Sequence, residues 1–86
     1  MLFKSMYTMY VLHSKRLDRF YVGYTNDLTR RLNEHNRIKG KFTDVGIPWV
    51  LVYKESYALK KDAMYREKFI KSKKSKKFIN ELVAYG

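Results

Sequence analysis

Cysteine is absent from the sequence, and only eight of its 86 residues are acidic. The lack of cysteine excludes a disulfide framework and any thiolate metal site, and with them the zinc-finger and iron–sulfur classes of small basic protein. Two histidines do not make a structural zinc site on their own. No apolar run approaches the roughly 20 residues of a membrane span, and the opening residues lack the features of a signal peptide. We therefore expect a cytoplasmic protein with no membrane contact.

Positive charge and aromatic residues dominate what is present. Lysine and arginine number 19, which gives a formal net charge of +11. With 45% hydrophobic and 16% aromatic residues, the chain exceeds the composition of disordered proteins, so we expect one small folded domain over 1–86, with 1–6 as a disordered leader. The excess charge favours a polyanionic partner, nucleic acid ahead of an anionic membrane, although some cytoplasmic proteins are simply basic.

The pattern of apolar and turn residues predicts the order β-β-α-β-α-α. Three runs rich in aromatic and β-branched residues are predicted strands: 7–12, 19–24 and 49–53. Two helices are predicted from capping residues and helical spacing, at 27–35 and 57–71, and a further basic helix or turn contains 78–83. Residues 37–46 have two glycines and no periodicity, which indicates a long loop. The fold class is therefore an α/β (α+β) sandwich, in which helices flank a three-stranded, mostly antiparallel sheet.

The first predicted helix places two polar residues beside its apolar stripe. Leu28 and Leu32 lie four residues apart on one face, and Arg31 and His35 border that face rather than opposing it. One interpretation is structural, with the stem of Arg31 along the edge of the core and His35 as a hydrogen-bonded boundary residue. The other is that both side chains serve a site at the seam between helix and sheet.

The second predicted helix places a carboxylate within its apolar face. Glu67 lies close to the direction defined by Leu59, Ala63 and Ile70. A carboxylate there is costly to bury unless it meets a cation or a metal ion. It could form a structural ion pair, with three candidate partners: Arg31, Arg66 and Lys71. It could instead be an oxygen ligand suited to Mg²⁺ or Mn²⁺.

Two tripeptides and the residues that follow them resemble the GIY-YIG nuclease superfamily. The tripeptides are MYV at 9–11 and YVG at 21–23, with ten residues between their tyrosines. The Arg31 and His35 pair follows, then the strand at 48–53 and the stretch 63–71 with its glutamate. The resemblance covers about 7–83. It is nearest to the small single-domain branch related to the N-terminal nuclease domain of the bacterial excision-repair C subunit.

The resemblance implies roles for five residues. Tyr10 and Tyr21 would be the tyrosines of the two motifs, although strand tyrosines are ordinarily core or cross-strand residues. Either Tyr10 or a neighbouring group would act as general base toward a metal-activated water. Arg31 would contact the scissile phosphate, and Glu67 would hold one divalent ion, Mg²⁺ or Mn²⁺. His35 matches a further position that is often His or Tyr.

Three other positions matter to the comparison. Gly23 would let its strand end closely against the catalytic helix. Thr8 stands where the first motif has a glycine. Asn80, thirteen residues after Glu67, is a further candidate for the site.

The implied function is that of a metal-dependent endonuclease that hydrolyses phosphodiester bonds in DNA, in repair or recombination. One alternative is a nucleic-acid-binding module of the same fold with weak catalysis, and another is a nuclease subunit that is active only with a protein partner. We expect a monomer or weak dimer.

Basic residues in the loop and the C-terminal third are candidates for tracking the phosphate backbone, although such runs are often solvated helix faces. They are Lys39, Lys41, Lys60, Lys68, Lys71, Lys73 and Lys74. Arg37 could extend this surface, and Phe42 or Tyr24 could stack on an unpaired base.

Overall fold

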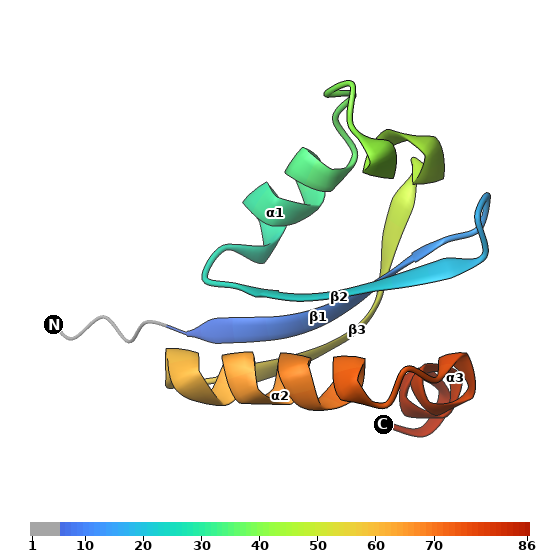
Figure 1. Cartoon of the computed structure of the whole chain (residues 1–86). Coiled ribbons are helices and arrows are strands. Elements are labelled where there is room, and N and C mark those ends of the chain that lie inside the picture. The colour runs from blue at the N-terminus through green and yellow to red at the C-terminus, as the bar shows by residue number, and fades with distance from the viewer. Residues whose placement is uncertain (1–5) are drawn as a thin grey trace, which may run out of the picture.

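A three-stranded antiparallel sheet forms the centre of the molecule in the computed structural model, which describes residues 6–86 (Figure 1). The strands are β1 (Tyr7–Ser14), β2 (Arg19–Thr25) and β3 (Trp49–Tyr57), in the order β2-β1-β3. Three α-helices and one short 3₁₀ helix accompany them: α1 (Leu28–His35), η1 (Phe42–Gly46), α2 (Lys60–Ser72) and α3 (Lys76–Tyr85). The order and sheet confirm the predicted fold class. Of the predicted leader, residues 1–5 lie outside the described residues.

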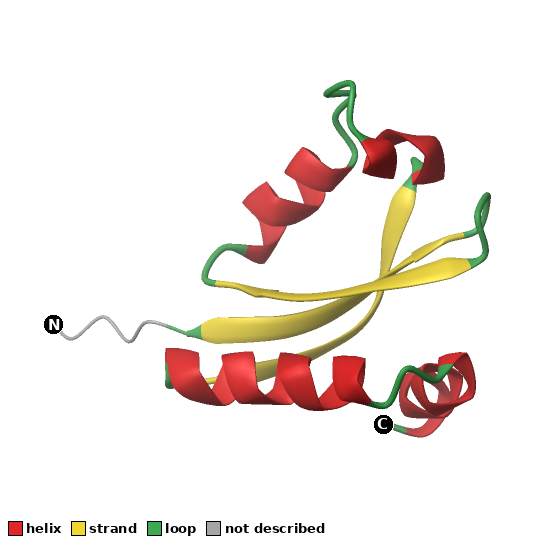
Figure 2. Cartoon of the chain, in the orientation of Figure 1, coloured by secondary structure: helices red, strands yellow, loops and turns green. Residues whose placement is uncertain are grey.

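Alternation along β1 sends its side chains into two separate apolar clusters. Met9 and Val11 are fully buried on the face covered by α2 and α3, where Ile70 joins them. Tyr10 and Leu12 point to the opposite face, which α1 covers. Figure 2 shows α1 on one side of the sheet and α2 with α3 on the other. The sheet is therefore a middle layer between helices.

Two boundaries differ from the sequence-based predictions. β3 continues to Tyr57, which pairs with Tyr7, so α2 begins three residues later than expected. Leu59 is the N-cap residue of α2 and its exposed fraction is 52%, so it does not belong to the apolar face assigned to it. Three polar residues, Lys54, Glu55 and Ser56, precede Tyr57 at the end of β3, so this part of the strand has little apolar signal, which explains the error.

The predicted loop at 37–46 is partly ordered as η1. The carboxylate of Asp44 accepts hydrogen bonds from the backbone N–H groups of Lys39 and Lys41, at 2.9 and 3.0 Å. These two bonds hold the first half of the segment against the second. A 3₁₀ helix of five residues has no apolar periodicity, so pattern reasoning had nothing to detect.

Candidate active site

A pocket of about 360 Å³ opens where β1 and β2 meet α1 and α2. Four residues predicted for catalysis line it, two from the sheet and two from helices: Tyr10, Tyr21, Arg31 and Glu67. Gly23, Lys60 and Tyr24, the last a predicted base-stacking residue, also line it, together with residues that sequence reasoning did not single out for the site: Tyr7, Thr25 and Asn26. Tyr10 and Glu67, which lie far apart in the sequence, thus face one cavity.

The ring of Tyr10 lies directly over Gly23 on the neighbouring strand. These two residues are paired across β1 and β2. A Cβ atom added at Gly23 would stand 2.6 Å from the hydroxyl oxygen of Tyr10 and 2.7 Å from its Cζ. The close approach that requires glycine is therefore to the ring of Tyr10, and not to the helix as expected. Gly23 leaves room for the tyrosine to turn along the sheet into the pocket.

Tyr10, Tyr21 and His35 form a compact group of rings. The rings of Tyr21 and His35 meet edge to face with centroids 4.4 Å apart, and those of Tyr10 and Tyr21 are 6.5 Å apart. The Tyr10 hydroxyl lies 3.5 Å from Nε2 of His35. His35 is buried and does not line the pocket, so it reaches the pocket only through the two tyrosines.

Burial controls the protonation of this group. It raises the pKa of Tyr10 to about 12, and this effect outweighs the positive charge of Arg31, which lowers that pKa. Burial also lowers the pKa of His35, and Arg31 and Lys39 act in the same direction. At neutral pH Tyr10 is therefore a phenol and His35 a neutral imidazole. The phenol and Nε2 of the imidazole share a hydrogen bond, in which the phenol donates when the imidazole proton is on Nδ1.

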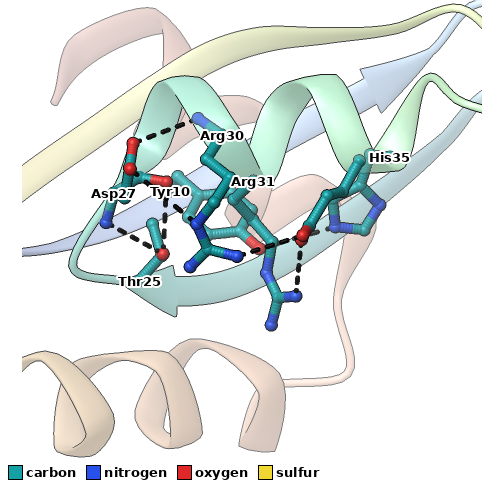
Figure 3. Close-up of polar contacts among 7 residues, drawn as sticks. Tyr10, Thr25, Asp27, Arg30, Arg31 and His35 are labelled. Atoms are coloured by element: carbon teal, nitrogen blue, oxygen red, sulfur yellow. Dashed lines mark hydrogen bonds and ion pairs between the residues drawn. The ribbon is translucent and has the colours of Figure 1, made fainter.

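Arg31 reaches the pocket from α1. The helix begins after Asp27, whose side chain accepts a hydrogen bond from the backbone N–H of Arg30 (Figure 3). One turn later the guanidinium of Arg31 contacts Glu34 at 3.3 Å, and Glu34 also pairs with Arg30 at 3.0 Å. Tyr10, through the negative charge of its ionised form, raises the pKa of Arg31, which is charged at any physiological pH. Glu34 was not predicted, although its spacing of three and four residues from the two arginines indicates such pairs.

Glu67 presents the one carboxylate that lines the pocket. Its side chain is 15% exposed, and Lys71 Nζ lies 3.1 Å from its Oε2. Of the three candidate partners, Lys71 is the one in ion-pair contact, while Arg66 turns to Glu55 at 3.0 Å. Lys71 Nζ also lies 5.9 Å from the centre of the Tyr21 ring. Lys71 thus lies beside two residues of the pocket lining without lining the pocket itself.

The donor set suits a hydrated magnesium or manganese ion. Within residues 6–86 no group of three or more histidines, cysteines, aspartates or glutamates could enclose a metal ion. Mg²⁺ is usually held by one or two carboxylates and keeps waters and substrate phosphates as its other ligands. A single partly exposed carboxylate in a polar pocket, as at Glu67, meets that requirement.

Of the lysines predicted to bind nucleic acid, and of Asn80, most lie outside the pocket. Lys60 lines it, whereas Lys73 lies over the rings of Phe69 and Phe78, at 4.5 and 5.8 Å. Five other predicted lysines are exposed outside its lining: Lys39, Lys41, Lys68, Lys71 and Lys74. Asn80, on α3, lines a separate hollow with Lys76, Lys77, Glu81, Ala84 and Tyr85. We therefore leave Asn80 out of the site.

Asn36 is a supporting residue that the sequence analysis missed. Its side-chain amide donates to the backbone carbonyl of Trp49 at 2.9 Å, and its oxygen accepts from the Trp49 N–H at 2.6 Å. This pair of bonds fastens the end of α1 to the start of β3. His35, the residue before, is thereby held against the sheet. An asparagine directly after a helix was the available signal.

Comparison with known proteins gives one consistent result. A family model described as the GIY-YIG catalytic domain matches residues 6–80. A UPF0213 protein of Streptococcus pneumoniae is 45% identical over 67 residues, which are 77% of this chain and 67% of that protein. The UPF0213 protein YazA of Bacillus subtilis is 42% identical over 66 residues, 72% of this chain and 67% of that one. The solution NMR structure of a UPF0213 protein from Bacillus halodurans is similar with a TM-score of 0.58 and 27% identity, and covers 92% of this chain and 83% of that chain.

Proposed function

Because the chain belongs to the GIY-YIG family, we propose that its pocket is the active site of a divalent-metal-dependent endonuclease that hydrolyses phosphodiester bonds in DNA. One observation carries the proposal. Helices on opposite faces of the sheet bring a permanent cation, Arg31, and a carboxylate, Glu67, to a pocket that also holds the buried phenol of Tyr10. These are the group types that phosphodiester hydrolysis requires.

Each residue has a distinct role in this proposal. Arg31 stabilises the negative charge that develops on the phosphate in the transition state. Glu67 holds Mg²⁺ or Mn²⁺, which when bound acts as a Lewis acid and lowers the pKa of a bound water. Tyr10 accepts a proton from the attacking water while it passes its own proton to Nε2 of His35. The hydrogen bond between Tyr10 and His35 provides the path for that transfer. Tyr21 packs against both rings and keeps them in place.

The basic surface supplies affinity rather than chemistry. The exposed lysines of the loop and of α2 would contact backbone phosphates without reading the sequence. Repair or recombination is the process in which we expect such a small nuclease to act. We expect the protein to work in the cytoplasm, as a monomer or weak dimer. In the part of the chain that the structure describes, no helix is long and apolar enough to cross a membrane.

The proposal is tested with the wild-type protein and supercoiled, branched and single-stranded DNA. We expect nicked or cut product that forms with Mg²⁺ or Mn²⁺ and not with EDTA. Asn80→Ala, on α3 and outside the pocket, should cut like wild type. Binding without product on every substrate would favour the binding module instead. Product that forms only with an added protein would indicate a partner-dependent subunit.

The rate of cleavage is expected to fall as pH decreases through the pKa of His35. That pKa lies below its ordinary 6.5, and once protonated His35 no longer accepts the proton of Tyr10. The pKa of Tyr10, about 12, places no alkaline limb in the neutral range. A pH profile of kcat/KM should therefore have an acid limb with its midpoint below 6.5 and then a plateau. His35→Gln should lower the plateau and remove that limb. A midpoint above 6.5, or an unchanged limb in the variant, would argue against this role.

Lys71→Met is expected to raise the affinity of the protein for Mn²⁺. The ammonium group of Lys71 lies 3.1 Å from the Glu67 carboxylate and must leave it before an ion can bind there. Ion pairs between exposed residues four positions apart on a helix are worth about 0.3–0.5 kcal/mol. Removal of a positive charge near the bound ion adds to this gain, so we expect the affinity for Mn²⁺ to increase about twofold to fivefold. Calorimetric titration with Mn²⁺ measures it. The exposed Lys68→Met serves as control, and equal affinities in both variants would contradict the expectation.

A further inference from the structure

The segment 37–46, between α1 and β3, exposes apolar side chains that the core does not use. Ile38, Phe42 and Val45 have exposed fractions of 81%, 79% and 54%. Arg37, Lys39 and Lys41 stand between and beside them, also exposed. We call residues 37–46 the basic apolar loop. In Figure 1 it lies beyond the C-terminal end of α1, on the same side of the sheet as that helix.

The backbone of this loop is held in place, and its one acidic residue is turned inward. Asp44 Oδ2 accepts from the N–H groups of Lys39 and Lys41, and its own N–H donates to the carbonyl of Lys41 at 3.0 Å. These backbone hydrogen bonds, led by that of Lys39, lower the pKa of Asp44 and keep it ionised. The Asp44 carboxylate therefore stabilises the backbone of the loop. The outward charge is only positive, from three cations within five residues.

Cations that alternate with exposed apolar groups fit a partner that has both phosphates and flat apolar faces. Nucleic acid with unpaired bases has both, whereas in a paired duplex the base faces are stacked away. An anionic membrane is the other surface with such chemistry. Anchoring in a bilayer is marginal even for one myristoyl chain, and this loop offers one aromatic and two aliphatic side chains. One base stacked on an aromatic ring, by contrast, contributes about 1–3 kcal/mol.

We propose that the basic apolar loop is a second nucleic-acid contact, at which Phe42 stacks on an unpaired base while Arg37, Lys39 and Lys41 bind the flanking phosphates. This inference rests on the proposed function and specifies its substrate as DNA with a single-stranded or branched segment. The loop follows α1 directly, and α1 carries Arg31 into the pocket. One helix therefore connects the contact with the scissile phosphate to the contact with the unpaired base.

The test measures binding separately from cleavage. Full-length Glu67→Gln, and the same chain with Phe42→Ala added, are titrated into labelled single-stranded DNA and into a duplex of the same sequence. We expect Phe42→Ala to weaken single-strand binding by about 5- to 150-fold, the range that corresponds to one lost stack. Duplex binding should change less than about twofold. Phe42→Trp should restore single-strand binding, and Tyr85→Ala, an exposed aromatic residue on α3, should change nothing.

The cations are tested by their salt dependence. Replacing Lys39 and Lys41 with alanine should weaken the binding of both substrates. For single strands, the slope of log affinity against log salt concentration should become less steep by about 1.4, since each phosphate contact contributes about 0.7. Equal loss on single strand and duplex in Phe42→Ala, or no loss, would overturn the inference. The inference would also be overturned if the protein bound phosphatidylserine vesicles more tightly than single-stranded DNA and this vesicle binding depended on Phe42.

The inference and the proposed function fail in different ways. Wild-type cleavage of DNA by a protein whose Phe42→Ala variant binds single strands normally would overturn the inference alone. Binding that depends on Phe42, by a wild-type protein that cuts no substrate, would overturn the proposed function and support the contact.

Discussion

Arg31→Ala is expected to lower the rate of phosphodiester cleavage by about 10²–10³-fold, the cost of removing one charged or hydrogen-bonding group that stabilises a transition state. The free energy of unfolding should change by less than about 0.5 kcal/mol. The side chain of Arg31 is 44% exposed and pairs with Glu34 in a contact that Arg30 also makes, so the fold depends little on it. Single-turnover rates at saturating protein, with unfolding by denaturant, separate the two effects.

Arg30→Ala is the matched control for this substitution. Arg30 is the preceding residue, has the same charge and shares Glu34, but it lines a different hollow and not the pocket. We expect it to retain cleavage within about threefold, a change typical of one exposed charge. Arg31→Lys should recover only part of the rate, because an ammonium group lacks the planar fork that binds a phosphate in two places. Equal losses in Arg30→Ala and Arg31→Ala would show that charge alone matters.

Gly23→Ala is expected to destabilise the protein by about 1–3 kcal/mol and to lower cleavage about tenfold or more. The new methyl group would stand 2.6 Å from the Tyr10 hydroxyl and 2.7 Å from Cζ, distances that the ring can relieve only by moving. That movement would also take Tyr10 away from His35. Denaturant unfolding and cleavage rates measure the two effects.

A double-mutant cycle identifies the cause of the Gly23→Ala effect. In a Tyr10→Ala background the ring is absent, so the second substitution should cost much less than it does in wild type. If Gly23→Ala destabilised both backgrounds equally, the conflict would lie with the backbone and not with Tyr10.

Sequence reasoning was most successful where side chains follow a period. The aromatic runs predicted the strands, and Asp27 predicted the start of α1. Those patterns say which face a residue occupies, because the face depends only on spacing. They led to Arg31 and Glu67 at the seams, and the structure places both on one pocket.

Contacts between residues that are far apart in the sequence could not be predicted from the spacing of residue types along it. The packing of Tyr10 over Gly23 follows from the register of β1 and β2, which the sequence alone left undefined. The sequence offered three ion-pair partners for Glu67. Only the packed structure shows that Lys71 pairs with it, whereas Arg66 pairs with Glu55 of β3. The inward turn of Asp44 is likewise a tertiary feature, and it converts an apparent loose loop into an ordered one.

Cleavage rate measured against Mg²⁺ concentration, for the wild-type protein and for Glu67→Gln, bears most directly on the assignment of this pocket as a nuclease site. Glutamine keeps the shape of the side chain and removes its charge, so the fold should be unchanged by circular dichroism. We predict a wild-type rate that rises with Mg²⁺ and saturates, and a variant with no product above background at any concentration. Equal rates in the two proteins, or no wild-type cleavage of any DNA substrate, would contradict the assignment.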